Sequence, residues 1–314
     1  MGERNKLFEV EGVTYKKCNG CGEVLSINNY SKAKYKKSGI RGECKFCQKK
    51  ARLKSFKEES DPNAPPTIIV NFSGGKDSTA MLLHMIELGE HIDYIVFADA
   101  GYEFPMLYDY IKTIEKLIKR PITILKANKS LDDWRFGKFT RGNKVGKIRG
   151  MPSVVAPCYW MRESKYLPLK KFSNSFPNSI NCIGIASDEQ ERVQINPNIR
   201  YPLIEWGWSE EKCIDYLQDK GILNDMYKHF SRTGCWMCPK QSNYSKYMLY
   251  KHYPKLWSML KIIDRENYRD TGKYLFIKST NYYEELFNSG KVPKDNGSIC
   301  YECKGIRNVY TEGK

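Results

Sequence analysis

One short segment restricts the fold of this 314-residue chain more than any other. A β-rich apolar run at residues 67–72 (TIIVNF) leads into SGGKDS at residues 73–78, and a helix-like run follows at residues 79–88. Glycine lets the backbone adopt positive φ and approach a ligand closely. The helix N-terminus offers unbonded N–H groups and a partial positive charge. The segment therefore predicts a phosphate-binding turn between a buried strand and a helix.

Further strand-like and helix-like runs follow this turn in alternation. Apolar runs at residues 92–98, 122–125 and 180–186 predict strands, and apolar residues recur at helical spacing over residues 104–118. Ser209 is expected to cap a helix that ends at Gly221. Such alternation predicts an α/β domain with a parallel sheet and right-handed crossovers. Residues 127–157 are rich in Lys, Arg and Gly, and we expect a long loop there that orders when substrate binds.

The chain divides into four regions by composition. We expect a basic cysteine-containing module at residues 1–60, a proline-rich linker at 61–66, the α/β domain at 67–230 and a helical, cysteine-containing region at 231–314. No apolar run is long enough to span a bilayer, and the N-terminus lacks the apolar core of a signal peptide. These features predict a cytoplasmic protein with no membrane partner.

Eight of the eleven cysteines occur as C-x-x-C pairs. In a reducing compartment this pattern indicates metal binding or redox chemistry rather than disulfides. The first two pairs predict a tetrahedral zinc site that stabilises a segment too short to fold on its own core, and its ligands would be Cys18, Cys21, Cys44 and Cys47. A redox pair is disfavoured because no thioredoxin-like βαβ pattern surrounds these cysteines.

The net charge of +16 favours a polyanionic partner. Residues 1–66 carry 15 Lys and Arg against 8 Asp and Glu, and tyrosines alternate with lysines in the cysteine module. Lysines that contact phosphates and aromatic rings that stack on bases are typical of nucleic-acid binding. We therefore expect this zinc finger to bind nucleic acid, with DNA favoured over RNA.

The SGGKDS turn is not a Walker A loop, because its lysine directly follows two adjacent glycines. It resembles the PP-loop of the ATP pyrophosphatases, which have the adenine nucleotide α-hydrolase-like, Rossmann-like fold. Four further segments resemble the phosphoadenosine phosphosulfate (PAPS) reductase branch: residues 99–105 (DAGYEFP), 158–165 (CYWMRESK), 184–192 (GIASDEQER) and 201–206 (YPLIEW). Residues 234–239 (GCWMCP) resemble a motif of DndC, the sulfur-transfer subunit of DNA phosphorothioation.

The resemblance implies ATP as cofactor, with Mg2+ bridging its phosphates. The implied catalytic residues are Lys76, Asp77, Lys165 and Arg192, and Glu189 and Glu205 are expected either to orient the basic side chains or to contact the substrate. The implied nucleotide-binding residues are Ser73, Gly74, Gly75, Lys76, Asp77, Ser78, Asp99 and Gly101.

A second cysteine set is open to two interpretations. Cys235, Cys238, Cys300 and Cys303 have the composition of a closed zinc site. Alternatively, Cys158 joins Cys235 and Cys238 in holding a four-iron four-sulfur cluster, with Cys300 or Cys303 as the fourth ligand, as the DndC resemblance implies. Thiolates suit both metals, so ligand type does not decide. Cys182 and Cys213 lie in apolar runs and are expected in the core.

Three functions fit these patterns. The first is an enzyme that splits ATP into AMP and pyrophosphate to adenylate a nucleic acid or nucleotide for sulfur transfer, with a cysteine desulfurase or another sulfur donor as partner. The second is a PAPS or APS reductase-like sulfonucleotide reductase. The intact loop disfavours it, as does the C-terminal sequence YECKGI at residues 301–306, which keeps only Glu-Cys of the reductases' E-C-G-L-H element. The third is a DNA-binding module that senses nucleotide without turnover.

Overall fold

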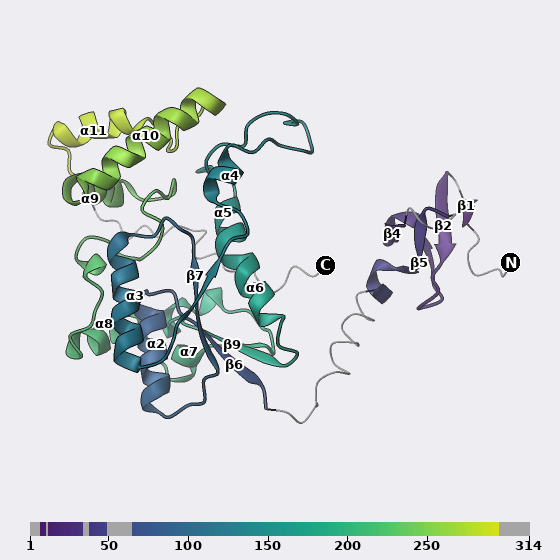
Figure 1. The fold of residues 1–314 in the computed structure, drawn as a ribbon, viewed down its shortest axis with the longest axis horizontal. Helices are drawn as coiled ribbons and strands as arrows, with labels where there is room; N and C mark the ends of the chain where they lie inside the picture. The colour runs from purple at the N-terminus through teal and green to yellow at the C-terminus, as the bar shows by residue number, and fades with distance from the viewer. Residues whose placement is uncertain (1–6, 11, 34–37, 49–64, 295–314) are drawn as a thin grey trace. The chain divides into compact units, whose positions relative to one another are not determined.

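The computed structural model describes residues 7–10, 12–33, 38–48 and 65–294, and it divides into two compact units, Met1–Pro65 and Pro66–Lys314 (Figure 1). The first boundary lies within the predicted linker, and the predicted boundary at residue 230 lies inside the second unit. Cys300 and Cys303 are outside the described residues, so the predictions made for them are not tested.

The first unit is built from two small antiparallel sheets. Strands β1 (Leu7–Val10), β2 (Val13–Lys17) and β3 (Val24–Ser26) form one sheet, and β4 (Tyr30–Lys32) pairs with β5 (Ile40–Cys44) in the other. A 3-10 turn, η2 (Ile27–Asn29), joins them. The buried cluster of this unit consists of Cys18, Tyr30 and Cys44. Such a small cluster buries too little apolar surface to hold a fold without further stabilisation.

The second unit contains a five-stranded parallel sheet, as the alternating sequence pattern predicts. Its strand order is β10-β9-β6-β7-β8, and every neighbouring pair is parallel. The strands are β6 (Thr67–Asn71), β7 (Tyr94–Asp99), β8 (Thr123–Lys126), β9 (Ser179–Ile183) and β10 (Ile199–Arg200). The chain proceeds from β6 to one side through β7 and β8 and then returns to the other side for β9. The carboxyl end of β6 is therefore a topological switch point, where ligands of open α/β sheets bind.

Helices cover this sheet, and three more helices extend the unit. In Figure 1, α2, α3 and α8 lie on one side of the strands and α6 on the other. The bounds of the covering elements are α2 (Lys76–Glu87), α3 (Pro105–Ile118), α5 (Tyr159–Met161), η3 (Arg162–Tyr166), α6 (Leu167–Ser173), η4 (Ser187–Arg192), α7 (Pro202–Glu205), α8 (Glu210–Asp219) and η5 (Asp225–Lys228). Ser209 caps α8 as predicted, because its side chain accepts a hydrogen bond from the Lys212 N–H.

The predicted helical region after residue 240 is confirmed. It forms α9 (Asn243–His252), α10 (Pro254–Thr271) and α11 (Thr280–Asn288). Leu249 and Trp257 of these helices belong to the same buried cluster as Val70 of β6 and Leu107 of α3. These helices therefore share the core of the sheet. No helix in the described part of the chain has the length and apolarity needed to cross a bilayer.

The predicted long loop over residues 127–157 is wrong in part. Ser130 and Asp133 form a capping box that starts a short helix, α4 (Leu131–Arg135). The capping sequence S-x-x-D is present in the chain. The apolar run that follows it is too short to show helical periodicity, so the sequence pattern did not predict a helix there. The chain after α4 also makes regular backbone contacts, including a bridge between Lys138 and Ile148.

Candidate functional site

The SGGKDS turn adopts a compact, internally bonded conformation after β6. The Ser78 Oγ atom accepts a hydrogen bond from the Ser73 N–H at 3.1 Å and lies 2.9 Å from Ser73 Oγ. Gly74 has φ of +71°, and a Cβ there would lie 2.6 Å from the Leu107 side chain. A side chain at this position would be both strained and blocked, so the glycine is required. Helix α2 begins at Lys76, earlier than its apolar pattern indicates.

Gly184 lets the end of β9 approach the first turn of α2. A Cβ at Gly184 would lie 2.9 Å from the Ser78 Cα and N atoms and 3.0 Å from the Asp77 carbonyl carbon. These neighbours are backbone atoms of a helix, which cannot rotate away as a flexible side chain can. The glycine that opens the GIASDEQER segment therefore sets the position of the helix N-terminus.

A pocket of about 340 Å³ lies at the carboxyl ends of β6, β7 and β9. Ser73, Gly75, Lys76, Asp77 and Ser78 contribute to its wall. Sequence-predicted residues from later segments also line it: Cys158, Lys165, Glu189, Arg192, Cys235 and Cys238. Segments that are distant in sequence thus meet at the phosphate turn.

Three carboxylates lie together at the mouth of α2, and two of them contact the Lys76 ammonium. Carboxylate oxygens of Asp77, Glu189 and Glu210 lie within 4.8 Å of one another. The Lys76 Nζ atom lies 2.9 Å from each Asp77 oxygen and 2.5 Å from Glu210 Oε1. Burial disfavours the charged form of Lys76, but Asp77 and Glu210 outweigh it and raise the pKa of the ammonium above its usual value. Burial raises the pKa of Asp77 to about 6 in spite of Lys76.

Tyr227 contacts the entrance of α2 from η5. Its hydroxyl accepts a hydrogen bond from the Lys76 N–H at 2.8 Å. A Cβ at Gly75 would lie 3.1 Å from Thr233 Oγ1 and 3.4 Å from the Tyr227 hydroxyl. Two hydroxyl groups therefore face the part of the turn where a phosphate would accept hydrogen bonds. Burial raises the pKa of Tyr227, so this hydroxyl stays neutral and can donate as well as accept.

The pocket also contains two ion pairs. Lys165 lies 2.6 Å from Glu103, whose side chain is fully buried. Arg192 pairs with Glu189 three residues earlier. The sequence alone leaves open whether Glu189 and Arg192 are a surface pair; in the structure Glu189 is 7% exposed and both residues line the pocket. Lys165 and Arg192 are the cations that the resemblance implies for the developing negative charge.

Four of the implied residues do not line the pocket. Asp99 accepts hydrogen bonds from the Gly101 N–H and the Tyr108 hydroxyl, both at 2.7 Å, so it shapes the turn after β7. Gly101, with φ of +73°, forms that turn, and Gly74 faces Leu107 as described above. Glu205 lies 2.9 Å from the Arg200 Nε atom rather than facing a ligand.

Sequence reasoning missed three residues of the site. Glu103 lies within a motif that the resemblance quotes, but no role was predicted for it. Glu210 is the first residue of α8, and Tyr227 lies in a segment with no motif. Each contacts the site only through tertiary packing. The acidic first turn of α8 could have pointed to Glu210, because a carboxylate there also favours the helix dipole.

Cys158, Cys235 and Cys238 share the pocket wall but are not shown to be ligands of one metal. Among the described residues, two groups of three or more ligand atoms lie within 4.8 Å of one another, and these three cysteines form neither. The Cys158 Sγ atom accepts a hydrogen bond from the Met161 N–H at 3.4 Å. A cluster or a second zinc at this position stays a prediction. Cys182 and Cys213 are fully buried core residues, as expected.

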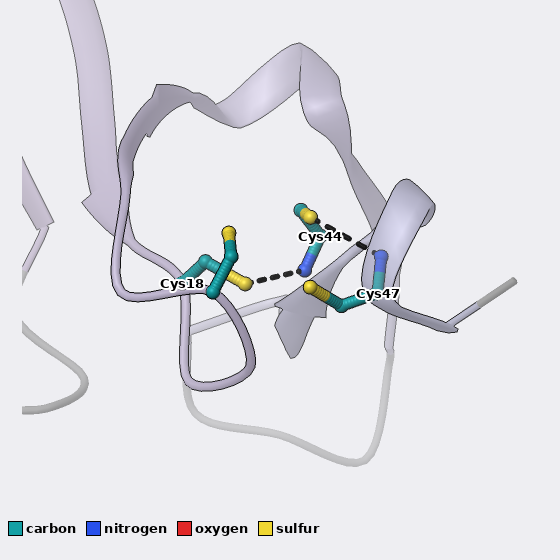
Figure 2. Close-up of side chains that lie close together, drawn as sticks. Cys18, Cys44 and Cys47 are labelled. Carbon is teal, nitrogen blue, oxygen red and sulfur yellow. Dashed lines mark hydrogen bonds between the residues drawn. The ribbon is translucent and has the colours of Figure 1, made fainter. Parts of the chain in front are cut away.

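The first unit contains the predicted four-cysteine cluster. The sulfur atoms of Cys18, Cys21, Cys44 and Cys47 lie within 4.8 Å of one another. Figure 2 shows the Cys44 N–H donating to Cys18 Sγ and the Cys47 N–H donating to Cys44 Sγ, at 3.2 and 3.4 Å. Burial disfavours the Cys18 thiolate, but backbone hydrogen bonds from Cys44, Cys21 and Gly20 lower its pKa to about 6. Four cysteine sulfur atoms this close together fit a tetrahedral metal.

Comparison with known proteins finds relatives of the sheet unit. Residues 67–151 match the family model of the phosphoadenosine phosphosulfate reductase domain. An uncharacterized protein of Methanocaldococcus jannaschii is 30% identical over 63% of this chain, and the chain spans 42% of that protein's length.

Two solved structures align with this chain at low sequence identity. The match to PAPS reductase from Candida auris, in complex with phosphate, has a TM-score of 0.41 at 16% sequence identity. The aligned region covers 59% of this chain and 88% of the reductase chain. The match to the U34-tRNA thiolase NcsA from Methanococcus maripaludis has a TM-score of 0.37 at 16% sequence identity. The aligned region covers 88% of this chain and 98% of the thiolase chain. The first part of the sheet unit, residues 67–151, is thus similar to the phosphoadenosine phosphosulfate reductase domain. These matches do not distinguish the DndC-like branch, which stays a prediction.

Proposed function

We propose that this protein is an enzyme that splits ATP into AMP and pyrophosphate and adenylates a nucleic-acid substrate for sulfur transfer. The observation that carries the proposal is the SGGKDS turn, which opens into a pocket whose wall also contains Cys158, Cys235 and Cys238. Phosphate-binding groups and thiols thus share one cavity, as a reaction that couples nucleotide activation to sulfur chemistry requires.

ATP would bind with its phosphates at the entrance of α2. The Asp77 and Ser78 N–H groups belong to the first turn of the helix, where backbone donors have no intrahelical partner. The Lys76 N–H and the Tyr227 hydroxyl form a hydrogen bond with each other, and a phosphate oxygen can accept from both once it separates them. This exchange lets an anion enter without leaving a buried donor unpaired.

The carboxylates of Asp77, Glu189 and Glu210 fit Mg2+, which prefers oxygen ligands. When bound, the ion would neutralise charge on the phosphates. Lys76 would then turn from these carboxylates towards the phosphates, because its long side chain carries a mobile point charge.

The chemistry is a displacement at the α-phosphorus. A substrate oxygen forms a bond to that phosphorus, the bond to the bridging oxygen breaks, and pyrophosphate leaves. A sulfur nucleophile at the oxidation level of sulfide then attacks the activated carbon or phosphorus, and AMP departs with the oxygen. Lys165 and Arg192 would offset negative charge in these steps, held in place by Glu103 and Glu189.

A double substitution in the turn tests the proposal. Ser73→Ala with Asp77→Ala should abolish AMP formation, measured under anaerobic conditions with ATP and either tRNA, single-stranded DNA or duplex DNA. Glu87→Gln, at the far end of α2, is the matched control and should retain activity. The proposal fails if the metal-loaded wild-type protein forms no AMP with any of these nucleic acids.

The family match supports a second candidate, a sulfonucleotide reductase, because residues 67–151 match the PAPS reductase domain. That enzyme would release sulfite from PAPS or APS with a thiol reductant and would form no pyrophosphate. Measuring sulfite and pyrophosphate in parallel separates the two functions. A module that senses nucleotide without turnover would bind ATP but release neither product. The zinc finger at residues 1–60 would contribute nucleic-acid affinity in the first and third cases.

A further inference from the structure

The connection between α4 and α5 carries an unusual charge distribution. Residues 134–162 contain seven Lys and Arg residues and no Asp or Glu. Most of this charge lies in residues 137–150, which we call the basic hairpin. Figure 1 shows this connection as a loop that extends beyond α4, away from the sheet. The positive charge is therefore displayed on a projecting element rather than spread over a helix face.

The basic hairpin has a defined backbone. The Phe139 N–H donates to the Lys147 carbonyl at 3.0 Å, and the Gly146 N–H donates to the Phe139 carbonyl at 2.9 Å. At its base the Arg149 N–H donates to the Gly137 carbonyl at 2.9 Å. These bonds hold its two arms together, so little backbone entropy remains to be lost when a partner binds.

The base of the hairpin is anchored to neighbouring elements. The Arg149 guanidinium lies 4.9 Å from the Trp134 ring centroid and 4.8 Å from that of Phe139. Arg135 pairs with Asp132 at 2.6 Å and with Glu266 of α10 at 3.0 Å. These contacts of Arg149 and Arg135 therefore fix the base of the hairpin to the rest of the unit.

Four cations lie on the projecting part at intervals of three residues: Lys138, Arg141, Lys144 and Lys147. All four are exposed, and none forms an ion pair with any residue that the structure describes. The nearby carboxylates are occupied, since Asp132 and Glu266 hold Arg135 and Asp133 bonds Ser130. The projecting part of the hairpin thus carries a charge of +4 without local compensation.

The hairpin leads directly into the pocket wall. The Tyr159 hydroxyl donates to the Gly150 carbonyl at 2.7 Å, and the neighbouring Cys158 and Trp160 line the pocket. The Trp160 Nε1–H donates to the Ala100 carbonyl at 3.0 Å, which fixes this segment against the end of β7. A long substrate held on the hairpin would therefore lie on the segment that continues into the pocket wall.

We propose that the basic hairpin binds the phosphodiester backbone of a polynucleotide whose reactive nucleotide enters the pocket. A polynucleotide presents regularly repeated negative charges, which match a row of cations on one element. The inference deepens the proposed function, because it rests on a nucleic-acid substrate and names the surface that holds it. It also places a nucleic-acid contact in the second unit, in addition to the zinc finger.

The test is salt-dependent binding by the full chain. The probes are fluorescein-labelled 30-mers of single-stranded DNA, single-stranded RNA and duplex DNA, measured by anisotropy at several salt concentrations. The variant replaces Lys138, Arg141, Lys144 and Lys147 with Gln. Four phosphate contacts contribute about −3 to −4 to the slope of log K against log salt. We therefore expect the slope to become shallower by this amount and affinity at low salt to fall by about 100-fold.

A matched variant removes the same charge elsewhere on the second unit. It carries Gln at Lys112, Lys116, Lys255 and Lys278, which are also exposed. This control should keep most of the affinity and the salt slope. A single Arg141→Glu substitution, at an exposed position of the projecting part, should give an intermediate loss if the quadruple variant melts early.

Each outcome decides the inference. A preference for DNA or for RNA that is lost in the hairpin variant supports it and identifies the partner. Equal affinity of the hairpin variant and the wild type overturns it, as does an equal loss in the control. Binding to phosphatidylserine vesicles but to no polynucleotide also overturns it. Hairpin-dependent binding without AMP formation would reject the proposed function and leave this inference standing.

Discussion

Gly184→Ala is the sharpest test of how the sheet positions the phosphate turn. The new methyl group would lie 2.9 Å from two backbone atoms of Ser78 and 3.0 Å from one of Asp77. Ordinary carbon contacts begin near 3.4 Å. The first turn of α2 would therefore have to move by about 0.5 Å or more, and overpacking of this kind typically costs about 1–3 kcal/mol.

This displacement should affect nucleotide binding more than stability. A loss of about 1–3 kcal/mol lowers the melting temperature by roughly 2–12 °C for a unit of this size. The phosphate-binding N–H groups lie on the turn that moves, so we expect affinity for α,β-methylene-ATP to fall at least about tenfold. Isothermal titration calorimetry measures the affinity, and differential scanning calorimetry measures the stability.

Gly89→Ala is the matched control at the other end of α2. Gly89 has φ of +68°, and a Cβ there would have no other atom within 4 Å, so alanine causes backbone strain without a collision. The strain costs about 1–2 kcal/mol, and nucleotide affinity should not change. If both variants lose affinity in proportion to their loss of stability, or if Gly184→Ala binds nucleotide normally, the argument that β9 sets the turn is refuted.

Three further predictions concern other parts of the chain. Metal analysis should find zinc at the four-cysteine cluster. A strong chelator should make residues 1–65 sensitive to protease, while residues 66–314 keep their melting temperature. An unchanged digestion pattern would contradict a stabilising metal. Glu103→Gln should slow AMP formation by about 100-fold, because Lys165 loses its fixed position. The free energy of unfolding should change by only about 1 kcal/mol, since Lys165 is partly exposed. A rate within twofold of the wild type would rule out this positioning role. Burial lowers the pKa of Lys246 from 10.5 to about 8, so between pH 8 and 10.5 the unfolded chain binds one proton more than the folded chain. The free energy of unfolding should therefore rise with pH over this range, by up to about 3 kcal/mol relative to Lys246→Met. Equal pH profiles of urea unfolding for the two proteins would show that Lys246 is not desolvated.

The sequence predicts those parts of the fold that depend on local patterns. The strand before Ser73 and the helix capped by Ser209 follow from apolar spacing and capping chemistry, and both are present. The four cysteines of the first unit could be grouped because their spacing alone permits one tetrahedral site. The short helix α4 was missed because its only signal is the pair Ser130 and Asp133.

The candidate site is less accessible to sequence reasoning, because much of it depends on tertiary contacts. The approach of Gly184 to α2 links residues more than 100 positions apart, and no local pattern encodes it. Tyr227 and Glu210 reach Lys76 in the same way. Asp99, which matches a motif, instead bonds the turn that follows it. A motif thus marks a segment, and only packing decides which of its side chains faces the pocket.

The π-helical turn η3 has a consequence for how this pocket can change in evolution. Its bonding is seen at the Leu167 N–H, which donates to the Arg162 carbonyl five residues earlier. Loss of a single codon there would leave an unbroken α-helix but rotate everything before it by about 100° relative to α6. Cys158 and Trp160 would then turn out of the cavity while α6 kept its packing. One inserted or deleted residue could therefore exchange the chemistry presented to the nucleotide without rebuilding the sheet.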